Sequence, residues 1–141
     1  MDKPVISGDT ITVPSSQDFL TDVDLFIEGR LQTYGLDQSL IADIAISVSE
    51  LVNNAIMHGN RRSGDKVVKV QIGRENRQVK ITVTDQGTGF DPGAIENPLD
   101  SDNLLKEVGR GIFIVRSLMD SVDIQPGDGG TTITIVKSIP G

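Results

Sequence analysis

The sequence predicts a two-layer α/β sandwich, in which helices cover one face of a mixed β-sheet. Segments with strand alternation and segments with the helical period follow in the order strand, two helices, two strands, helix, two strands. The 141 residues carry 37% hydrophobic side chains, enough for one buried core that needs no disulfide, and the chain has no cysteine. A single domain over residues 1–141 is therefore expected.

The first half of the chain is expected to form one strand and two helices. Residues 11–13 alternate as a short strand that stops at a proline. Ser15 or Ser16 can cap a helix that extends to about residue 34. Asp37 can cap a longer helix that extends to about residue 57, and a glycine follows each helix.

The second half is expected to form two hairpins separated by a long loop and a helix. The stretch over residues 85–111 is rich in Gly and Pro, and loops of this length are usually functional or mobile. A helix over residues 111–119 follows it. The expected strands span residues 67–72, 79–84, 121–125 and 132–137.

Composition excludes several classes of function. Twenty acidic against thirteen basic residues give a net charge of −7, which repels phosphate backbones, so nucleic-acid binding is not expected. The absence of cysteine and the single histidine, His58, exclude a zinc site built from thiolates. Residues 1–10 lack the apolar core of a signal peptide, and no run reaches the roughly 20 apolar residues of a membrane span. A cytoplasmic protein without membrane contact is expected.

A polar stripe runs along the otherwise apolar second helix. Glu50, Asn54 and His58 are spaced four apart and therefore lie on one face, with Asn53 beside them. Since the rest of this helix is apolar and largely buried, the stripe should face a polar site. A carboxylate beside a carboxamide can activate a hydroxyl and hold hydrated Mg²⁺. The alternative is an ordinary amphipathic helix whose polar edge faces water.

A glycine motif directly follows the second expected strand of the first hairpin. In Asp85-Gln86-Gly87-Thr88-Gly89 the glycines allow a backbone to pass close to a flat ligand. Asp85 can accept a hydrogen bond from an amino group. The alternative is a plain β-turn, because Asp and Gly are common turn residues.

Two further glycine motifs lie later in the chain. Gly109-Arg110-Gly111 precedes the last helix, and the exposed N–H groups of a helix start attract phosphate while Arg110 adds positive charge. It is neither a Walker A loop nor a Rossmann fingerprint, and it can also be a flexible loop with a surface arginine. Thr131 follows Gly130 at the final hairpin turn, where its hydroxyl could reach a ligand.

Taken in order, these four motifs resemble the ATP-binding domain shared by gyrase, the ninety-kilodalton heat-shock chaperone, histidine kinases and MutL, the Bergerat fold. The resemblance covers residues 19–136. The chain is most similar to the small anti-sigma-factor serine kinases, in the helix Ser-Glu-Leu-Val-Asn-Asn-Ala-Ile-x-His-Gly and in the helix Gly-Arg-Gly-Ile-x-Ile-Val.

The resemblance implies a role for each matched residue. Glu50 matches the general base that takes the proton of a protein serine, and Asn54 matches the ligand of Mg²⁺. Asp85 matches the carboxylate that reads the adenine amino group of ATP. Asn53 is given a supporting role and His58 a structural one. The other matched residues are expected to bind nucleotide: Gly87, Gly89 and Thr131 near the adenine, and Gly109, Arg110 and Gly111 at the phosphates.

The family resemblance implies an ATP- and Mg²⁺-dependent serine/threonine protein kinase. Its substrate would be a STAS-type anti-anti-sigma partner, its second partner a sigma factor, and its assembly a homodimer. Residues 91–109 are expected to lack order without nucleotide. One alternative is a binding module that holds nucleotide and transfers nothing. The other is a detached histidine-kinase catalytic domain that phosphorylates a histidine in trans.

Overall fold

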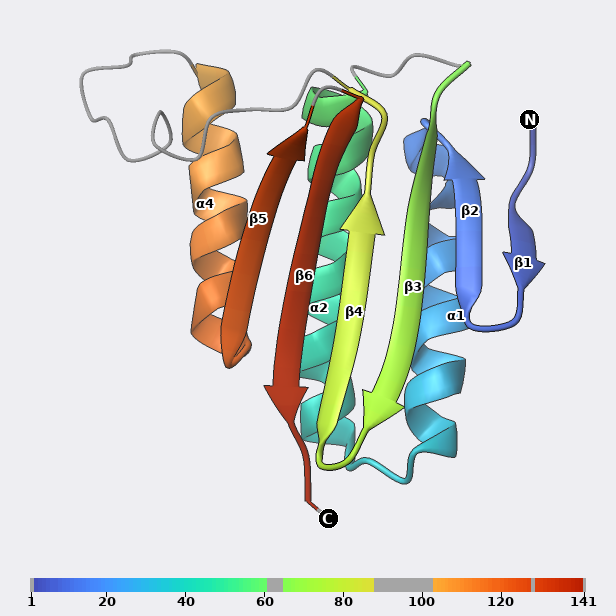
Figure 1. Cartoon of the computed structure of the whole chain (residues 1–141), viewed down its shortest axis with the longest axis vertical. Helices are drawn as coiled ribbons and strands as arrows, with labels where there is room; N and C mark the ends of the chain where they lie inside the picture. Colours follow the sequence, from blue (N-terminus) through green and yellow to red (C-terminus); the bar gives the residue numbers. More distant parts are fainter. Residues whose placement is uncertain (1, 61–64, 88–102, 128, 141) are drawn as a thin grey trace.

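The computed structural model describes residues 2–60, 65–87, 103–127 and 129–140. Two short turns, η1 and η2, adjoin the helices α1 and α2, and Figure 1 shows the arrangement of the strands and helices. The elements in chain order are β1 (Val5–Ser7), β2 (Thr10–Pro14), η1 (Gln17–Phe19), α1 (Leu20–Thr33), α2 (Gln38–Asn54), η2 (Ala55–Gly59), β3 (Val67–Glu75), β4 (Gln78–Thr84), α4 (Asn103–Leu118), β5 (Ser121–Gly127) and β6 (Gly130–Ser138).

The described strands form one sheet in the order β1-β2-β3-β4-β6-β5. Every neighbouring pair is antiparallel. Helices α1, α2 and α4 lie on one face of this sheet (Figure 1). The predicted two-layer α/β sandwich is therefore confirmed, and within the described sheet its pairings are all antiparallel.

Strand alternation decides which face meets the helices. On β3, Val68, Val70 and Ile72 are buried towards the helices, whereas Lys69 and Gln71 point to the other face and are exposed. The same alternation runs through β4 and β6. No described element covers the outer face, which explains why its side chains are mainly Thr, Lys and Gln.

Helix α2 is the centre of the helical layer and packs against both α1 and α4. Asp37 caps it as predicted, because its carboxylate accepts a hydrogen bond from the Leu40 amide at 2.8 Å. The segment Gln38–Gly59 is long and apolar enough to cross a membrane by length and composition alone. Its most apolar window is 50% buried inside the protein, however, as expected for the core helix of a globular domain.

Two elements differ from the sequence predictions. Strand β1 was not predicted, because it has only three residues, all exposed, and shows no alternation of burial. Helix α4 begins at Asn103 instead of residue 111, so the predicted loop end at Gly109 is wrong. A glycine costs a helix only about 1 kcal/mol, which the packing of α4 against α2 can offset.

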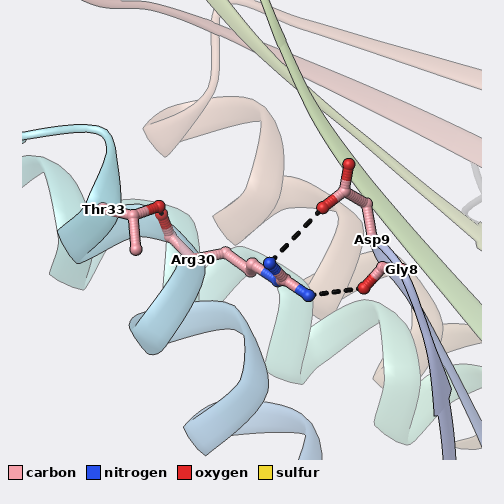
Figure 2. Close-up of polar contacts among 4 residues, drawn as sticks. All are labelled: Gly8, Asp9, Arg30 and Thr33. Carbon is pink, nitrogen blue, oxygen red and sulfur yellow. Dashed lines mark hydrogen bonds and ion pairs between the residues drawn. The ribbon is translucent and has the colours of Figure 1, made fainter.

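Arg30 ties α1 to the turn between β1 and β2 (Figure 2). Its guanidinium donates a hydrogen bond to the Gly8 carbonyl and lies 3.6 Å from the Asp9 carboxylate. Thr33 donates to the Arg30 carbonyl one turn later in the helix. Gly8 has a φ of +58°, a conformation that other residues rarely adopt, so the turn that receives Arg30 depends on glycine.

Candidate functional site

The polar stripe of α2 faces a pocket between α2 and α4. Its volume is about 330 Å³. The stripe therefore lines an open pocket, and its role as a binding site stays a prediction. Residues of α2 and residues of α4 line this pocket together, although the two sets are about 55 positions apart in the sequence. Its lining residues are Glu50, Asn53, Asn54, His58, Arg110, Gly111 and Ile114.

Gly111 lets the backbone of α4 lie directly against Glu50 and Asn54. A Cβ atom placed on Gly111 would be 3.0 Å from Asn54 Nδ2 and 3.1 Å from Glu50 Oε2. Both distances are shorter than ordinary contacts of a Cβ atom. A side chain at this position would therefore press on the carboxylate and the carboxamide of the pocket.

Asn54 has hydrogen-bonding capacity that the described residues do not use. The residue is 6% exposed, and its Nδ2 is buried without a hydrogen-bond partner among them. Such an atom costs about 1–3 kcal/mol and indicates a site for a bound group. The described residues contain no cluster of three His, Asp or Glu residues that could hold a metal ion. The unpartnered Nδ2 is a donor and suits an anionic oxygen, whereas the carboxamide oxygen of Asn54 is of a ligand type that Mg²⁺ accepts, and Mg²⁺ usually takes few protein ligands.

A second group of residues lies where β4 ends, around the buried carboxylate of Asp85. The side chain is 5% exposed, and its Oδ1 accepts hydrogen bonds from the amides of Gly87 at 3.0 Å and Thr131 at 3.1 Å. Oδ2 accepts none from the described residues. Burial raises the pKa of Asp85 above its usual value, while the two backbone hydrogen bonds and Lys66 act in the opposite direction. One oxygen is thus fixed and the other is available to an amino group.

Three glycines surround Asp85 at distances that exclude a side chain. A Cβ on Gly59 would lie 2.3 Å from Asp85 Oδ2, and a Cβ on Gly87 would lie 1.6 Å from the Gly59 carbonyl oxygen. Gly130 has a φ of +150°, and its Cβ would lie 1.9 Å from the Asp85 carbonyl oxygen. Sequence reasoning identified Gly87 but gave no role in nucleotide binding to Gly59 or Gly130.

Thr131 is paired with Asp85 through the backbone. The Asp85 amide donates to the Thr131 carbonyl at 3.0 Å, in addition to the bond from the Thr131 amide. The Thr131 hydroxyl is buried and has no hydrogen-bond partner among the described residues. The structure thus places Thr131 beside Asp85, where the sequence expected it.

Asn60 holds the segments around this group together and was missed by the sequence reasoning. It is 1% exposed, and its Nδ2 donates to Ser15 Oγ at 2.8 Å and to the Val67 carbonyl at 2.9 Å. Its Oδ1 accepts from the Gln86 amide at 2.7 Å. Asn60 therefore ties the ends of β2, β3 and β4 to the end of α2. Its only sequence signal was its place directly after the helix motif.

The two groups of residues are joined by η2, a π-helical turn at the end of α2. His58 in this turn lines the pocket of Glu50, and the next residue, Gly59, touches Asp85. π-Turns within helices are rare and frequently mark functional sites. This short turn therefore fixes the position of the residues around Asp85 relative to the pocket of Glu50.

Several residues that the sequence predicted for the site lie in a different element from the one expected. Others lie outside the described residues. Gly109, Arg110 and Gly111 lie inside α4, beyond its first turn, so their amides are bonded within the helix instead of free at its start. Gly89 and most of residues 91–109 lie outside the described residues. Asn53 lines the pocket and accepts a hydrogen bond from Gln17 at 2.9 Å, in keeping with a supporting role.

Comparison with known proteins assigns a family to this arrangement. The family described as a histidine kinase-like ATPase domain matches residues 13–137. The serine-protein kinase RsbW of Staphylococcus epidermidis is 31% identical over 134 residues, which cover 90% of this chain and 84% of that protein. RsbW of Staphylococcus aureus strain Newman is 30% identical over 134 residues, which again cover 90% of this chain and 84% of that protein.

Solved structures share the fold at lower sequence identity. The RsbU and RsbW domains of Rv1364c from Mycobacterium tuberculosis match 96% of this chain with a TM-score of 0.63 and 23% identity. The chain spans 31% of that longer protein. The mycobacterial sensor histidine kinase MprB matches 92% of this chain with a TM-score of 0.54 and 16% identity.

Proposed function

The chain belongs to the anti-sigma-factor serine kinase family of histidine kinase-like ATPase domains, and from this premise we propose that it is an ATP-dependent serine/threonine protein kinase. Its substrate in this proposal is a serine or threonine of a STAS-type anti-anti-sigma protein. When not engaged with that partner, it holds a sigma factor inactive. The proposal includes a homodimer, a cytoplasmic location and no contact with nucleic acid or membrane.

The observation that carries the proposal is the position of Glu50. Its carboxylate lines an open pocket beside Asn54, close to the backbone of α4. Nucleotide binding alone requires no base at this position. A carboxylate that is accessible to a second protein can take the proton of an attacking hydroxyl.

The proposed reaction follows from these positions. The Asp85 carboxylate and the Thr131 hydroxyl bind the adenine, and the phosphates lie towards Asn54 and Arg110. A Mg²⁺ ion held by Asn54 would neutralise phosphate charge, which phosphoryl transfer requires more than covalent chemistry. Glu50 takes the hydroxyl proton as the new P–O bond forms and ADP leaves.

A second candidate is a nucleotide-dependent binding module that transfers nothing. It is favoured by the helical setting of Gly109 and Gly111, because amides bonded within α4 cannot align a terminal phosphate for transfer, whereas recognition of the adenine at Asp85 does not require them. In this case the same residues would only set a conformation that a partner recognises.

A comparison of the wild type with Glu50→Ala tests the proposal. Binding of Mg-ATP is measured first, and each protein is then mixed with radiolabelled ATP and STAS-domain proteins from the same organism. We expect similar ATP affinity and a loss of phosphate transfer by about 10²- to 10⁴-fold in the variant. Glu28→Ala, which removes a carboxylate on α1, is the matched control and should transfer normally.

Two outcomes would contradict the kinase proposal. If the wild type binds ATP but labels no partner, the binding module is the better description. If the label is acid-labile, the product is a phosphohistidine and the chain acts as a histidine kinase. Equal transfer by the wild type and Glu50→Ala would remove Glu50 from the mechanism.

A further inference from the structure

Three exposed apolar side chains lie on the two helices that form the pocket of Glu50. Ile46 on α2 is 47% exposed, and on α4 Phe113 is 72% and Ile114 37% exposed. These are three of the six large hydrophobic side chains that are exposed among the described residues. Single apolar residues on a surface are ordinary, whereas a group of them beside a site indicates a binding surface.

The packing of the two helices sets these three residues at a similar height along α2 and α4. Helices α2 and α4 run in opposite directions (Figure 1). Gly111 lies against Glu50, and Ile46 is one helical turn before Glu50 on the same face. Ile46 is therefore level with the turn of α4 that follows Gly111 and carries Phe113 and Ile114. Ile114 itself lines the pocket.

The exposed face of α4 is also basic. Arg110 and Arg116 are exposed, and neither makes a hydrogen bond or an ion pair with the residues that the structure describes. The chain as a whole has a net charge of −7. At the other end of the helical layer, α1 carries Asp22, Asp24 and Glu28. On the described part of α4, two exposed arginines therefore accompany the exposed apolar residues, whereas the charged residues of α1 are mainly acidic.

We propose that Phe113, Ile114, Arg110 and Arg116 of α4, together with Ile46 of α2, form the docking surface for the protein substrate. This inference rests on the proposed function. A serine side chain is short, so the substrate backbone must approach the pocket closely and its flanks must touch the rim. Specific interfaces bury about 800 Å² on each partner, more than the pocket mouth offers. The matching partner surface is apolar and acidic around its acceptor serine.

Phe113 and Arg116 are the residues to test, because neither belongs to the nucleotide site. The measurement is the affinity of Phe113→Ser and Arg116→Glu for the STAS-domain acceptor in the presence of Mg-ADP, together with the KM for that acceptor. We expect each variant to weaken acceptor binding about 10-fold or more, as for exposed aromatic and arginine anchors of interfaces. ATP affinity and kcat should stay at wild-type values.

Matched controls come from the other parts of the surface. Leu25→Ser removes an apolar side chain on α1 that is 65% exposed, and Arg77→Glu reverses an exposed charge in the β3–β4 turn. Both should bind the acceptor like the wild type. Phe113→Tyr should retain binding, since it keeps the aromatic surface. If Phe113→Ser and Arg116→Glu bind as tightly as these controls, the docking surface is wrong.

The same experiment separates the docking surface from the kinase proposal. If the wild type binds a STAS-domain protein without phosphorylating it, the kinase proposal fails and the binding constants of the variants still decide the docking surface. If the wild type binds none of these proteins, the partner chemistry is wrong and both proposals are overturned.

Discussion

The two halves of the candidate site are built in different ways. At the end of β4, the carboxylate of Asp85 is buried and held by backbone amides, and neighbouring glycines approach too closely for any side chain. In the pocket between α2 and α4, Glu50 stands at an open surface and Asn54 Nδ2 has no partner among the described residues. Each half contains a buried polar atom without a partner among the described residues, Thr131 Oγ1 in one and Asn54 Nδ2 in the other, but only the carboxylate of Asp85 is already fixed by hydrogen bonds.

Under the proposed function, this difference would divide recognition of the nucleotide from phosphate transfer. The buried group around Asp85 is fixed by backbone packing, so in the proposed function it would present one acceptor geometry to the adenine at little further cost. In the same proposal, the phosphates and a protein substrate would complete the open pocket. Substitutions that add a side chain against the buried group should therefore damage folding and ATP affinity together, and substitution of Glu50 in the open pocket should damage transfer alone.

The largest effect on folding is expected for Gly87→Ala. The added Cβ would lie 1.6 Å from the Gly59 carbonyl oxygen, so one backbone must move away from the other. Overpacking of this kind costs about 3 kcal/mol, which lowers the Tm by about 10 °C in a domain of this size. ATP affinity should fall with it. Thermal unfolding and ATP titration measure both.

Gly73→Ala is the matched control for this substitution. Gly73 lies in β3, and a Cβ placed on it would meet no atom within 4 Å. This variant should keep the wild-type Tm and ATP affinity. A Gly87→Ala protein as stable as Gly73→Ala would mean that the group around Asp85 is adaptable, and the contrast between the two halves would disappear.

The sequence could predict features that depend on local patterns, but not those that depend on contacts between distant residues. Alternation and helical period predicted the helices and five of the six described strands, because these patterns are local. Asp85 and Thr131 were predicted from motifs at strand ends. The roles of Gly59 and Asn60 were not, because they arise from contacts with Asp85, Ser15 and Gln86, each more than 20 residues away.

The start of α4 shows a second limit of local signals. Here a local pattern predicted a loop where the structure has a helix. Two glycines two residues apart predicted a loop end, yet helix continues through both. Ile112 and Val115 are buried in the core, and the tertiary packing of α4 against α2 overrides the weak helix propensity of glycine. Propensity is a property of the residue, whereas this packing depends on a helix more than 50 residues earlier in the chain.

Asp85→Asn is expected to separate ATP affinity from stability. The asparagine can still accept both amide hydrogen bonds through Oδ1, but the charged acceptor at Oδ2 is lost. A hydrogen bond to a charged group is worth about 1.5–3 kcal/mol, so ATP affinity should fall roughly 10- to 100-fold. Calorimetric titration measures this loss. Wild-type affinity in the variant would exclude Asp85 from adenine recognition.

The pH dependence of stability tests the same residue without nucleotide. Burial raises the pKa of Asp85 in the folded state, so the folded protein binds this proton more tightly than the unfolded chain. Stability from this group is fully present below the usual pKa of 3.8 and is lost as the pH rises through the higher folded value. The free energy of unfolding of the wild type, relative to Asp85→Asn, should fall across that window. A rise there would contradict the effect of burial.

The smallest effect is expected for Gly111→Ala, on the open side. Its Cβ would meet only the ends of two flexible side chains, Asn54 at 3.0 Å and Glu50 at 3.1 Å, which can shift by a few tenths of an ångström. The alanine also favours the helix by up to about 1 kcal/mol, so the Tm should be unchanged or higher. Since misplacing a catalytic group by about 1 Å costs 10²-fold, the smaller shift of Glu50 should lower kcat by about tenfold or less.

Gly29→Ala in α1 is the control for Gly111→Ala, because its Cβ would meet no atom within 4 Å. Both variants gain the same helix propensity, and only Gly111→Ala should lose phosphate transfer, with ATP affinity retained in both. A loss of ATP affinity in Gly111→Ala would instead show that α4 must unwind at this turn before its amides bind phosphate. The open half of the site would then be assembled by a change in the helix itself, and not by displacement of Glu50.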